Sequence, residues 1–233
     1  MSLRVALLNA AHDGSRTARN FQREIDAALT EFDAVDGDLP GGFDFDGIVV
    51  TGSRSSVYWE EPWIDGLVEY VAAAAERDVP ILGVCFGHQV VAEALGGTVE
   101  GMGEYEIGYR TVSRTTEDAL FTGIDRDFTV FTTHSDAVTA LPPGADLLAE
   151  NDYGVHAFKK GSAYGVQFHP EYDTETAEHI TNSKDALSDE RKAEVLGGIN
   201  AENFEAACEA KRLFDNFLAL ADGARDLQVA SDD

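Results

Sequence analysis

A cysteine in the first half of the chain stands where a nucleophile would be presented. The apolar run at residues 81–84 ends at Cys85, Gly83 and Gly87 flank the thiol, and a helical pattern follows at residues 89–95. A strand, a sharp turn and a helix with a nucleophile at the apex form a nucleophile elbow. Such a turn needs neighbours without a Cβ atom, and the positive end of the following helix favours thiolate over thiol. We therefore expect a reactive Cys85 rather than a structural cysteine.

A nucleophilic thiol needs a base, and a second short stretch supplies one. An apolar strand pattern at residues 163–168 ends at His169, Pro170 stops the strand, and Glu171 follows. An imidazole at a strand end can take the thiol proton, while a nearby carboxylate orients the ring and stabilises the imidazolium. Cys85, His169 and Glu171 are therefore the predicted catalytic set for acyl transfer to sulfur.

Two motifs in this order resemble the signatures of class I glutamine amidotransferase domains, such as the one in GMP synthetase. They are Gly83-Val84-Cys85-Phe86-Gly87-His88-Gln89 and His169-Pro170-Glu171, and the resemblance runs from about Val5 to Glu171. It implies hydrolysis of the glutamine side-chain amide through a thioester, with Cys85 as nucleophile, His169 as base and Glu171 as third member. It also implies that Gln89 and the stretch His134-Ser135-Asp136 line the substrate pocket.

The elements around these motifs predict a flavodoxin-like α/β fold: a mainly parallel sheet with helices on both faces and an antiparallel extension. Strand patterns at residues 3–8, 32–35 and 46–51 alternate with helical patterns at 15–29 and 59–77. Short alternating runs between residues 98 and 167 indicate strands that extend one edge of the sheet. We expect a single domain over residues 1–222, with a helical extension over 173–222, and a tail over 223–233 that frays from residue 228.

Acyl transfer also needs two convergent backbone N–H groups for the oxygen that becomes negative. The N–H of Phe86 is one, because it directly follows the nucleophile. Gly52 and Ser53 are candidates for the other, because ligands bind outside the carboxyl ends of strands in such a sheet. The family commonly carries two glycines and a proline here, so Gly52-Ser53-Arg54 departs from its pattern. The departure resembles stand-alone members, which include γ-glutamyl peptidases.

Three functions remain open at this point. The preferred one is a glutaminase or amidotransferase subunit that passes ammonia to a separate synthetase, because no Gly-rich ATP-binding loop is present in the sequence. The second is a stand-alone γ-glutamyl peptidase or hydrolase, and the third is a non-catalytic binding or regulatory protein, which the intact catalytic set disfavours. The substrate would be glutamine or a γ-glutamyl small molecule, and no cofactor is expected. The histidines show no close metal-ligand spacing, so no metal is predicted; His12 is expected to be solvated, and His88 and His156 structural.

The balance of charge is strongly acidic, with 43 acidic against 17 basic residues and a net charge of −26. Such a field repels nucleic acids and anionic membranes, which are not expected as partners. The acids are scattered along the chain, which favours adaptation to a salt-rich cytoplasm over an acidic docking patch for a basic partner, since molar salt screens charges within about 3 Å. The N-terminus leads into a strand without a signal peptide, no stretch has the length of a membrane span, and two cysteines suit a reducing compartment. We expect a cytoplasmic protein of a halophile.

Overall fold

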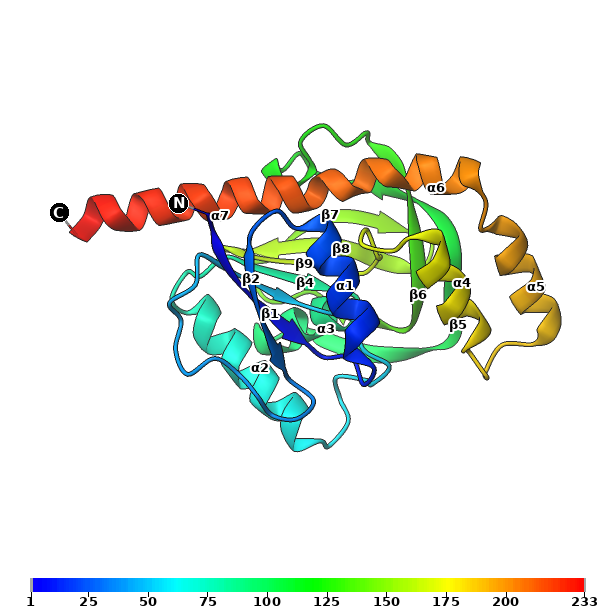
Figure 1. The fold of residues 1–233 in the computed structure, drawn as a ribbon, viewed down its shortest axis with the longest axis horizontal. Coiled ribbons are helices and arrows are strands. Elements are labelled where there is room, and N and C mark those ends of the chain that lie inside the picture. Colours follow the sequence, from blue (N-terminus) through cyan, green and yellow to red (C-terminus); the bar gives the residue numbers. More distant parts are fainter. Residues whose placement is uncertain (1, 233) are drawn as a thin grey trace.

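The computed structural model describes the backbone of residues 2–232 and the side chains of residues 2–226. Within these residues nine strands form one sheet, in the order β2-β1-β3-β4-β9-β8-β7-β5-β6 (Figure 1). The strands are β1 (Arg4–Asn9), β2 (Ala28–Asp33), β3 (Gly47–Val50), β4 (Ile81–Val84), β5 (Thr98–Arg114), β6 (Asp127–Ala140), β7 (Asp146–Asn151), β8 (Gly154–Lys160) and β9 (Ala163–Val166). The first five strands of this order, β2-β1-β3-β4-β9, pair in parallel. The remaining pairs are antiparallel. The predicted parallel sheet with an antiparallel extension is confirmed.

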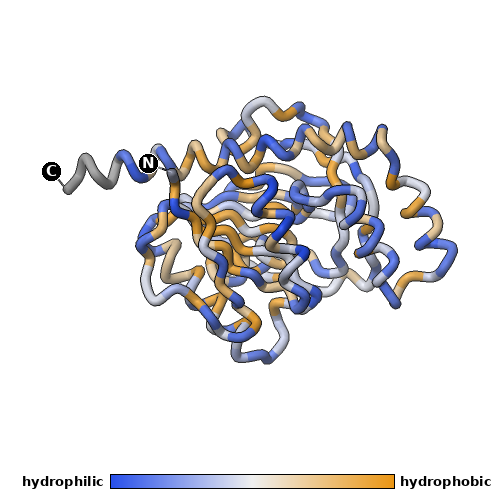
Figure 2. The backbone as a smooth tube through the Cα atoms, viewed as in Figure 1, coloured by the Kyte–Doolittle hydropathy of each residue, from blue (hydrophilic) through white to orange (hydrophobic). Residues whose placement is uncertain are grey.

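Both faces are buried along the inner parallel strands β1, β3, β4 and β9, which explains why these strands are largely apolar, whereas the edge strand β2 is mostly exposed. In β1, Val5 and Leu7 pack into the core on one face, while Ala6 and Leu8 pack into the core on the other. Helices α1 (Gly14–Glu24) and α7 (Arg212–Asp232) pack against the face that carries Val5 and Leu7. Helices α2 (Pro62–Ala75) and α3 (Phe86–Ala94) pack against the opposite face. Figure 2 shows the resulting concentration of hydrophobic segments along the strands in the middle of the molecule.

The segment after α1 differs from its prediction. The apolar spacing favoured a helix over residues 15–29 and a strand over 32–35, but α1 ends at Glu24 and β2 already begins at Ala28. Residues 28–33 pair in parallel with the whole of β1, from Ala28 opposite Arg4 to Asp33 opposite Asn9. The apolar spacing of this segment fits a helix equally well, but pairing with β1 makes it a strand.

In the antiparallel part, β5 and β6 form a long ribbon instead of the shorter runs expected. Their register shifts between Gly101 and Glu106, and after this irregularity Glu106 lies directly opposite His134. Residues from the two strands are thereby brought to one end of the sheet, close to the elbow.

The carboxyl-terminal segment consists of the predicted helices with different limits. Helices α4 (Thr174–Asn182) and α5 (Asp189–Gly198) come first, followed by α6 (Ala201–Ala207), a short 3-10 segment and α7. The 3-10 segment at Cys208–Lys211 interrupts the single helix expected over residues 201–221. Helix α7 continues to Asp232, through most of the range expected to be a tail, and residue 233 lies outside the described residues.

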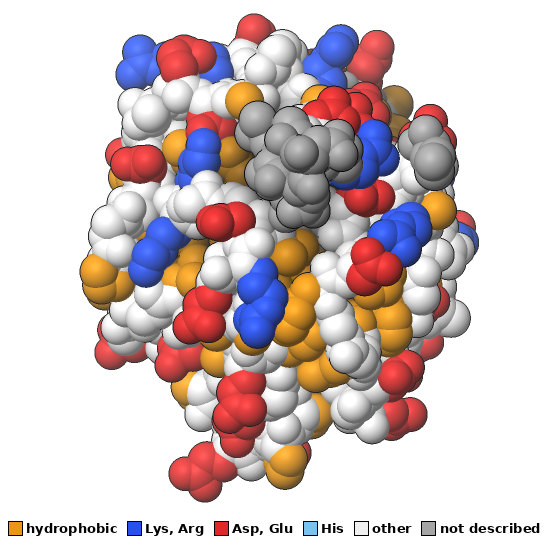
Figure 3. Space-filling view, turned by 90° about the vertical axis from the view of Figure 1, so that its left-hand side faces the viewer, with side chains coloured by type: hydrophobic (Ala, Val, Ile, Leu, Met, Phe, Trp, Pro, Cys, Tyr) orange, Lys and Arg blue, Asp and Glu red, His pale blue; other side chains and the backbone are white. Residues whose placement is uncertain are grey.

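The surface carries the charge that the composition implies. On the face drawn in Figure 3, Asp and Glu side chains are spread over the whole outline rather than gathered in one patch. Among the described helices, none combines the length and the apolar character needed to cross a bilayer.

Candidate active site

Cys85 forms the turn between β4 and α3 in a conformation that residues with a side chain rarely adopt. Its φ and ψ are 54° and −103°, and the only other described non-glycine residue with a positive φ is Asp78. The Cys85 N–H donates to the Val166 oxygen of β9 (2.8 Å), and the Gly87 N–H donates to the Thr51 oxygen (3.1 Å). These bonds hold a strained backbone in place from two neighbouring strands. The thiol stands at the apex of the turn, as the sequence predicts.

The two glycines of the motif leave no room for side chains. A Cβ atom on Gly83 would lie 2.1 Å from the carbonyl oxygen of Gly87, and a Cβ atom on Gly87 would lie 2.2 Å from that of Val50. Both distances are far below van der Waals contact. The absence of side chains therefore allows α3 to begin directly against β3 and β4.

His169 and Glu171 lie just beyond β9, and both side chains are buried. The backbone N–H of His169 donates to the Phe131 oxygen of β6 (2.9 Å), which fixes the residue beside the antiparallel part. Nδ1 of His169 lies 2.8 Å from Oε1 of Glu171. The ring stacks on Tyr172, with centroids 4.0 Å apart. Glu171 thus holds the imidazole within the plane of the ring, and Tyr172 restrains it from one face.

Burial by itself would lower the pKa of His169, because the imidazolium loses its hydration. The negative charges of Glu171 and Cys85, together with hydrogen bonds to both side chains, outweigh burial and raise the pKa to about 10. A histidine with this pKa carries a proton at neutral pH. The arrangement thus places an imidazolium beside the Cys85 side chain.

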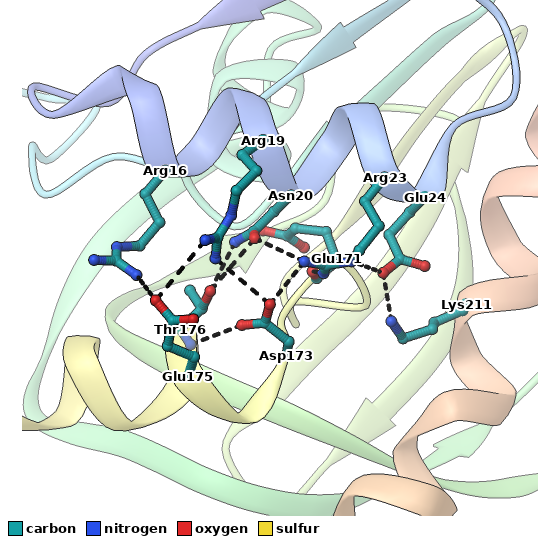
Figure 4. A network of polar contacts seen from close by, with 10 residues as sticks. All are labelled: Arg16, Arg19, Asn20, Arg23, Glu24, Glu171, Asp173, Glu175, Thr176 and Lys211. Atoms are coloured by element: carbon teal, nitrogen blue, oxygen red, sulfur yellow. Dashed lines mark hydrogen bonds and ion pairs between the residues drawn. The ribbon is translucent and has the colours of Figure 1, made fainter.

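Helix α1 holds the backbone of Glu171 from the outside. Arg23 donates from Nη2 to the Glu171 carbonyl oxygen (2.5 Å) and from Nη1 to Asp173 Oδ2 (2.7 Å) (Figure 4). The adjacent Glu24 accepts a hydrogen bond from Lys211, in the segment that precedes α7. Helix α1 therefore links the residues after His169 to the carboxyl-terminal helices.

The loop after β3 packs against the thiol and the imidazole. A Cβ atom on Gly52 would lie 3.0 Å from Cε1 of His169 and 3.6 Å from Cβ of Cys85. Within the described part of the chain, the N–H groups of Gly52 and Ser53 have no acceptor. Phe86 is the first residue of α3, where an N–H group has no partner inside the helix. The three predicted oxyanion donors are thus close to Cys85 and available.

Two cavities meet at Cys85. The inner one, of about 40 Å³, is lined by the predicted substrate residues Gln89, His134, Ser135 and Asp136. The outer one, of about 190 Å³, is bordered by α4 and the start of α1, through His12, Asp13, Arg16, Thr17, His179 and Ile180. The residues common to both linings are Ser53, Arg54, Cys85, Thr133 and Lys184.

The polar wall of the inner cavity is fixed by hydrogen bonds. The Asp136 carboxylate accepts from the hydroxyl groups of Ser56 (2.6 Å) and Tyr58 (3.0 Å). Nε2 of Gln89 donates to the Asp136 carbonyl oxygen and to Oε1 of Gln167, at 3.2 Å each. The predicted Gln89 and Asp136 therefore belong to one network on the inner side of the thiol.

A buried carboxylate supports this wall from behind. Oε2 of Glu106 lies 2.6 Å from Nε2 of His134 and 3.0 Å from Nε2 of His156, while Oε1 accepts from Asn151 (2.6 Å). Burial would raise the pKa of Glu106, but the bonds to the two histidines outweigh it and lower the pKa to about 2. Nδ1 of His134 is bonded to the Asp136 oxygen (2.9 Å), so both of its nitrogens serve structure rather than base catalysis.

The same cluster modifies the expectation about metals. One ligand atom from each of Glu106, His134 and His156 lies within 4.8 Å of the others, a grouping that could hold an ion. The residues belong to three different strands, β5, β6 and β8, so their sequence spacing gave no sign of it. Both Nε2 atoms bond to the same carboxylate oxygen instead, while Nδ1 of His156 has no partner among the described residues.

Three residues at the site were missed from the sequence. His12, expected to be solvated, lines the outer cavity, and its Nε2 lies 2.9 Å from Oγ of Ser55. Tyr172 and Lys184 also line that cavity, although both follow the last motif. Tyr172 directly follows His169-Pro170-Glu171, and that adjacency to the predicted base was the available signal. Lys184 had none.

Comparisons with known proteins agree with this geometry. The sequence model of the family "Glutamine amidotransferase class-I" matches residues 16–185. Two curated relatives are named GMP synthase (glutamine-hydrolyzing). The one from Pyrobaculum aerophilum is 44% identical over 127 residues, which are 53% of this chain and 24% of the relative. The one from Staphylococcus aureus is 35% identical over 163 residues, which are 68% of this chain and 30% of the relative.

The chain thus spans less than a third of the length of these relatives. A solved structure described as a glutamine amidotransferase, from Thermotoga maritima, has the same fold with a TM-score of 0.78 at 22% identity, covering 93% of this chain and 98% of that one. The family match covers most of the chain, including the elbow and the His169-Pro170-Glu171 segment. The chain therefore belongs to the class I glutamine amidotransferase family.

Proposed function

We propose that this chain hydrolyses the γ-amide of glutamine through a glutamyl thioester on Cys85. The observation that carries the proposal is a buried imidazole beside the strained cysteine: His169, with a pKa raised to about 10 and the Glu171 carboxylate 2.8 Å from its Nδ1. Membership of the class I glutamine amidotransferase family supports the same chemistry. The chain is then a cysteine-dependent amidohydrolase that needs no cofactor.

In the proposed acylation, the Cys85 sulfur bonds to the γ-carbon of glutamine and the carbonyl oxygen becomes negative. The N–H groups of Phe86 and of Gly52 or Ser53 stabilise that oxygen. The His169 imidazolium gives its proton to the nitrogen, and ammonia leaves as the carbon–nitrogen bond breaks. The neutral imidazole next takes a proton from water, whose oxygen attacks the thioester. The carbon–sulfur bond then breaks, releasing glutamate and restoring the thiolate.

The inner cavity is the proposed site for the amino-acid end of the substrate. Asp136 offers a carboxylate for the α-ammonium group, and charge-assisted bonds of this kind are stronger than neutral ones. Ser135, Gln89 and His134 complete the lining, with His134 held by Glu106. Because Ser56 and Tyr58 already fix the Asp136 carboxylate, it is oriented before a substrate arrives.

The names of the relatives favour a second candidate, in which the ammonia passes to a separate synthetase subunit. Those relatives are called GMP synthases, and this chain spans less than a third of their length. A subunit of that kind would release glutamate slowly alone and faster with its partner. A stand-alone γ-glutamyl hydrolase would work without a partner, and a non-catalytic binding protein would release no glutamate at all.

The test compares the two cysteines of the chain. Cys85→Ala should abolish both the release of glutamate from glutamine and labelling by a glutamine-mimicking electrophile. Cys208→Ala should leave both intact, because Cys208 lies in the 3-10 segment and outside both cavity linings. Labelling that persists in Cys85→Ala would refute the mechanism.

A further inference from the structure

Two cations stand beside the thiol in a chain dominated by acids. Arg54 comes from the loop after β3 and Lys184 from the connection between α4 and α5. Both line the inner and the outer cavity, as Cys85 does, so they border the junction where the scissile bond would lie. Neither residue belongs to the catalytic set or to the substrate residues that the sequence indicates.

The two cations lack acidic partners, although acids outnumber bases by 43 to 17 in this chain. Among the described residues, Arg54 donates to the hydroxyl of Ser183 (3.2 Å), and Nζ of Lys184 lies 5.2 Å from the centre of the Tyr105 ring; neither is within 4.0 Å of a carboxylate oxygen. Arg16 and Arg23 nearby are each paired with a carboxylate, on Glu175 and Asp173.

The positive charge at this junction is therefore uncompensated by protein carboxylates. Burial lowers the pKa of Lys184, the charge of Cys85 raises it, and Arg54 lowers it further. The three groups thus act on one another electrostatically. Lys184 is half-buried and unpaired, which costs free energy that an anionic ligand would recover, while Arg54 is exposed and free to approach the same ligand.

The shape of the junction indicates which part of a substrate brings the anion. In the proposed binding mode the amino-acid end of a glutamyl group lies in the inner cavity, where the Asp136 carboxylate suits an ammonium. The outer cavity is larger, about 190 Å³ against about 40 Å³, and shares Cys85 with the inner one. Free ammonia, the leaving group of glutamine, does not need such a space. A group attached to the γ-nitrogen would occupy it, and a carboxylate two bonds beyond the nitrogen would lie near the thiol.

We propose that Arg54 and Lys184 bind the carboxylate of an amine leaving group, so that the chain accepts γ-glutamyl amino acids and selects them over neutral γ-glutamyl amides. The inference rests on the proposed attack of Cys85 on a γ-amide. The sulfur–carbon bond forms, the carbon–nitrogen bond breaks, and the nitrogen takes the His169 proton, so that an amino acid leaves in place of ammonia. Asp13, the carboxylate at the start of α1, also lines the outer cavity and limits how far the anion extends from the two cations.

A first experiment needs no turnover. Iodoacetate and iodoacetamide both transfer a CH₂ group to sulfur with loss of iodide, and they differ in carrying a carboxylate or a neutral amide. In a Cys208→Ser background, the ratio of their rate constants at Cys85 is measured by intact mass at fixed pH and ionic strength. We expect the ratio to fall about tenfold or more in the Arg54→Met, Lys184→Met double variant, consistent with the loss of charge-assisted bonds.

The controls are Arg126→Met, at an exposed position, and Lys160→Met, in β8 opposite the first residue of β9; both remove the same charges outside the two linings. They should leave the ratio within about twofold of the parent value, because charges outside the site are screened by salt. A ratio that is unchanged in the double variant, or that falls equally in the controls, would overturn the anion site.

A second experiment assigns the site to the leaving group. The values of kcat/KM are compared for γ-glutamylglycine and γ-glutamylglycinamide, which differ only in the carboxylate, and for glutamine. We expect the parent to prefer γ-glutamylglycine over the glycinamide, and the double variant to lose most of that preference. An equal loss on all three substrates would overturn the assignment. No turnover of any substrate, together with a changed alkylation ratio, would refute the proposed hydrolysis and leave the anion site standing.

Discussion

Tyr172 lies against the face of the His169 imidazole, with ring centroids 4.0 Å apart and planes inclined by 19°. The face of an aromatic ring attracts a cation, and the attraction grows when water is excluded. Tyr172 therefore favours the protonated form of His169 from the face, while Glu171 favours it in the plane. The residue directly follows His169-Pro170-Glu171, so the same short segment supplies both contacts.

Replacing this ring should weaken the imidazolium. In Tyr172→Leu we expect a lower His169 pKa, so that kcat/KM for glutamine falls roughly two- to fifteenfold near pH 10 and little at pH 7, since cation–π contacts contribute about 0.5–2 kcal/mol. Tyr172→Phe is the matched control, because it keeps the aromatic face and should retain nearly full activity. The pKa can be followed by NMR of the imidazole. Equal losses in the two variants would assign the effect to the hydroxyl group instead.

Glu171 gives a pH-dependent prediction. Its charge is foremost among the influences that raise the pKa of His169 to about 10, so Glu171→Gln should lower that pKa. A histidine whose pKa is higher in the folded than in the unfolded state stabilises the fold fully below about pH 6.5, and this stabilisation is lost as the pH rises through about 10. The advantage in thermal midpoint of the parent over Glu171→Gln should therefore shrink between these pH values.

Asp173→Asn provides the control for this measurement. Asp173 caps α4 and pairs with Arg23, and its pKa is lowered, chiefly by bonds from Thr176 that outweigh burial. Its contribution is thus complete throughout the range from pH 6.5 to 10 and fades only in acid. The midpoint difference between the parent and Asp173→Asn should stay constant over that range, and a parallel decline in both variants would contradict the assignment to His169.

The turn at Cys85 and the pairing of His169 with Glu171 were predictable because both depend on local sequence. Gly83 and Gly87 are needed wherever a helix begins this close to its strand, so their spacing around Cys85 announces the turn. His169-Pro170-Glu171 places an imidazole and a carboxylate within two residues, and the structure brings them to hydrogen-bonding distance. Local constraints of this kind appear in the sequence directly.

Other parts of the site depend on contacts between distant segments, which spacing cannot reveal. Glu106, His134 and His156 meet because β5, β6 and β8 are brought to the same end of the sheet. Lys184 reaches the thiol only through the path of the chain after α4. The end of α1 was misplaced for the same reason, since pairing of residues 28–33 with β1 decides it. The predicted order of strands and helices was right where apolar runs are bounded by glycine or proline.

Two glycines on helices should respond to alanine in opposite ways. Gly87→Ala should prevent stable folding, because its Cβ would lie 2.2 Å from the backbone oxygen of Val50. Gly66→Ala, on α2, should raise the free energy of unfolding by about 0.5–1 kcal/mol, because alanine favours helix and the nearest atom to the new Cβ is 4.0 Å away. Circular dichroism and urea unfolding distinguish the outcomes. A soluble, fully folded Gly87→Ala protein would contradict the close approach of α3 to β3.

The acidic surface predicts how stability depends on salt. Ion pairs such as Arg4–Asp44 are exposed and therefore contribute little, and salt should weaken them further. Repulsion among the excess acids acts over the whole molecule and is screened within about 3 Å at 1 M salt. Since the net charge is −26, relief of repulsion should exceed the loss of ion pairs. We expect the thermal midpoint to rise steeply between dilute buffer and molar KCl.

A variant with fewer exposed acids tests the cause of that rise. Asp36→Asn, Asp38→Asn, Glu60→Gln and Glu61→Gln alter exposed positions outside both cavity linings and lower the negative charge by four. Combined, they should raise the midpoint in dilute buffer and make its salt dependence shallower, because less repulsion remains to be screened. If salt instead stabilised the fold because it is excluded from the protein surface, these substitutions would leave the salt dependence of the midpoint unchanged. A midpoint that is flat across the salt range in the parent would remove the halophile interpretation and favour an acidic surface that docks a basic partner.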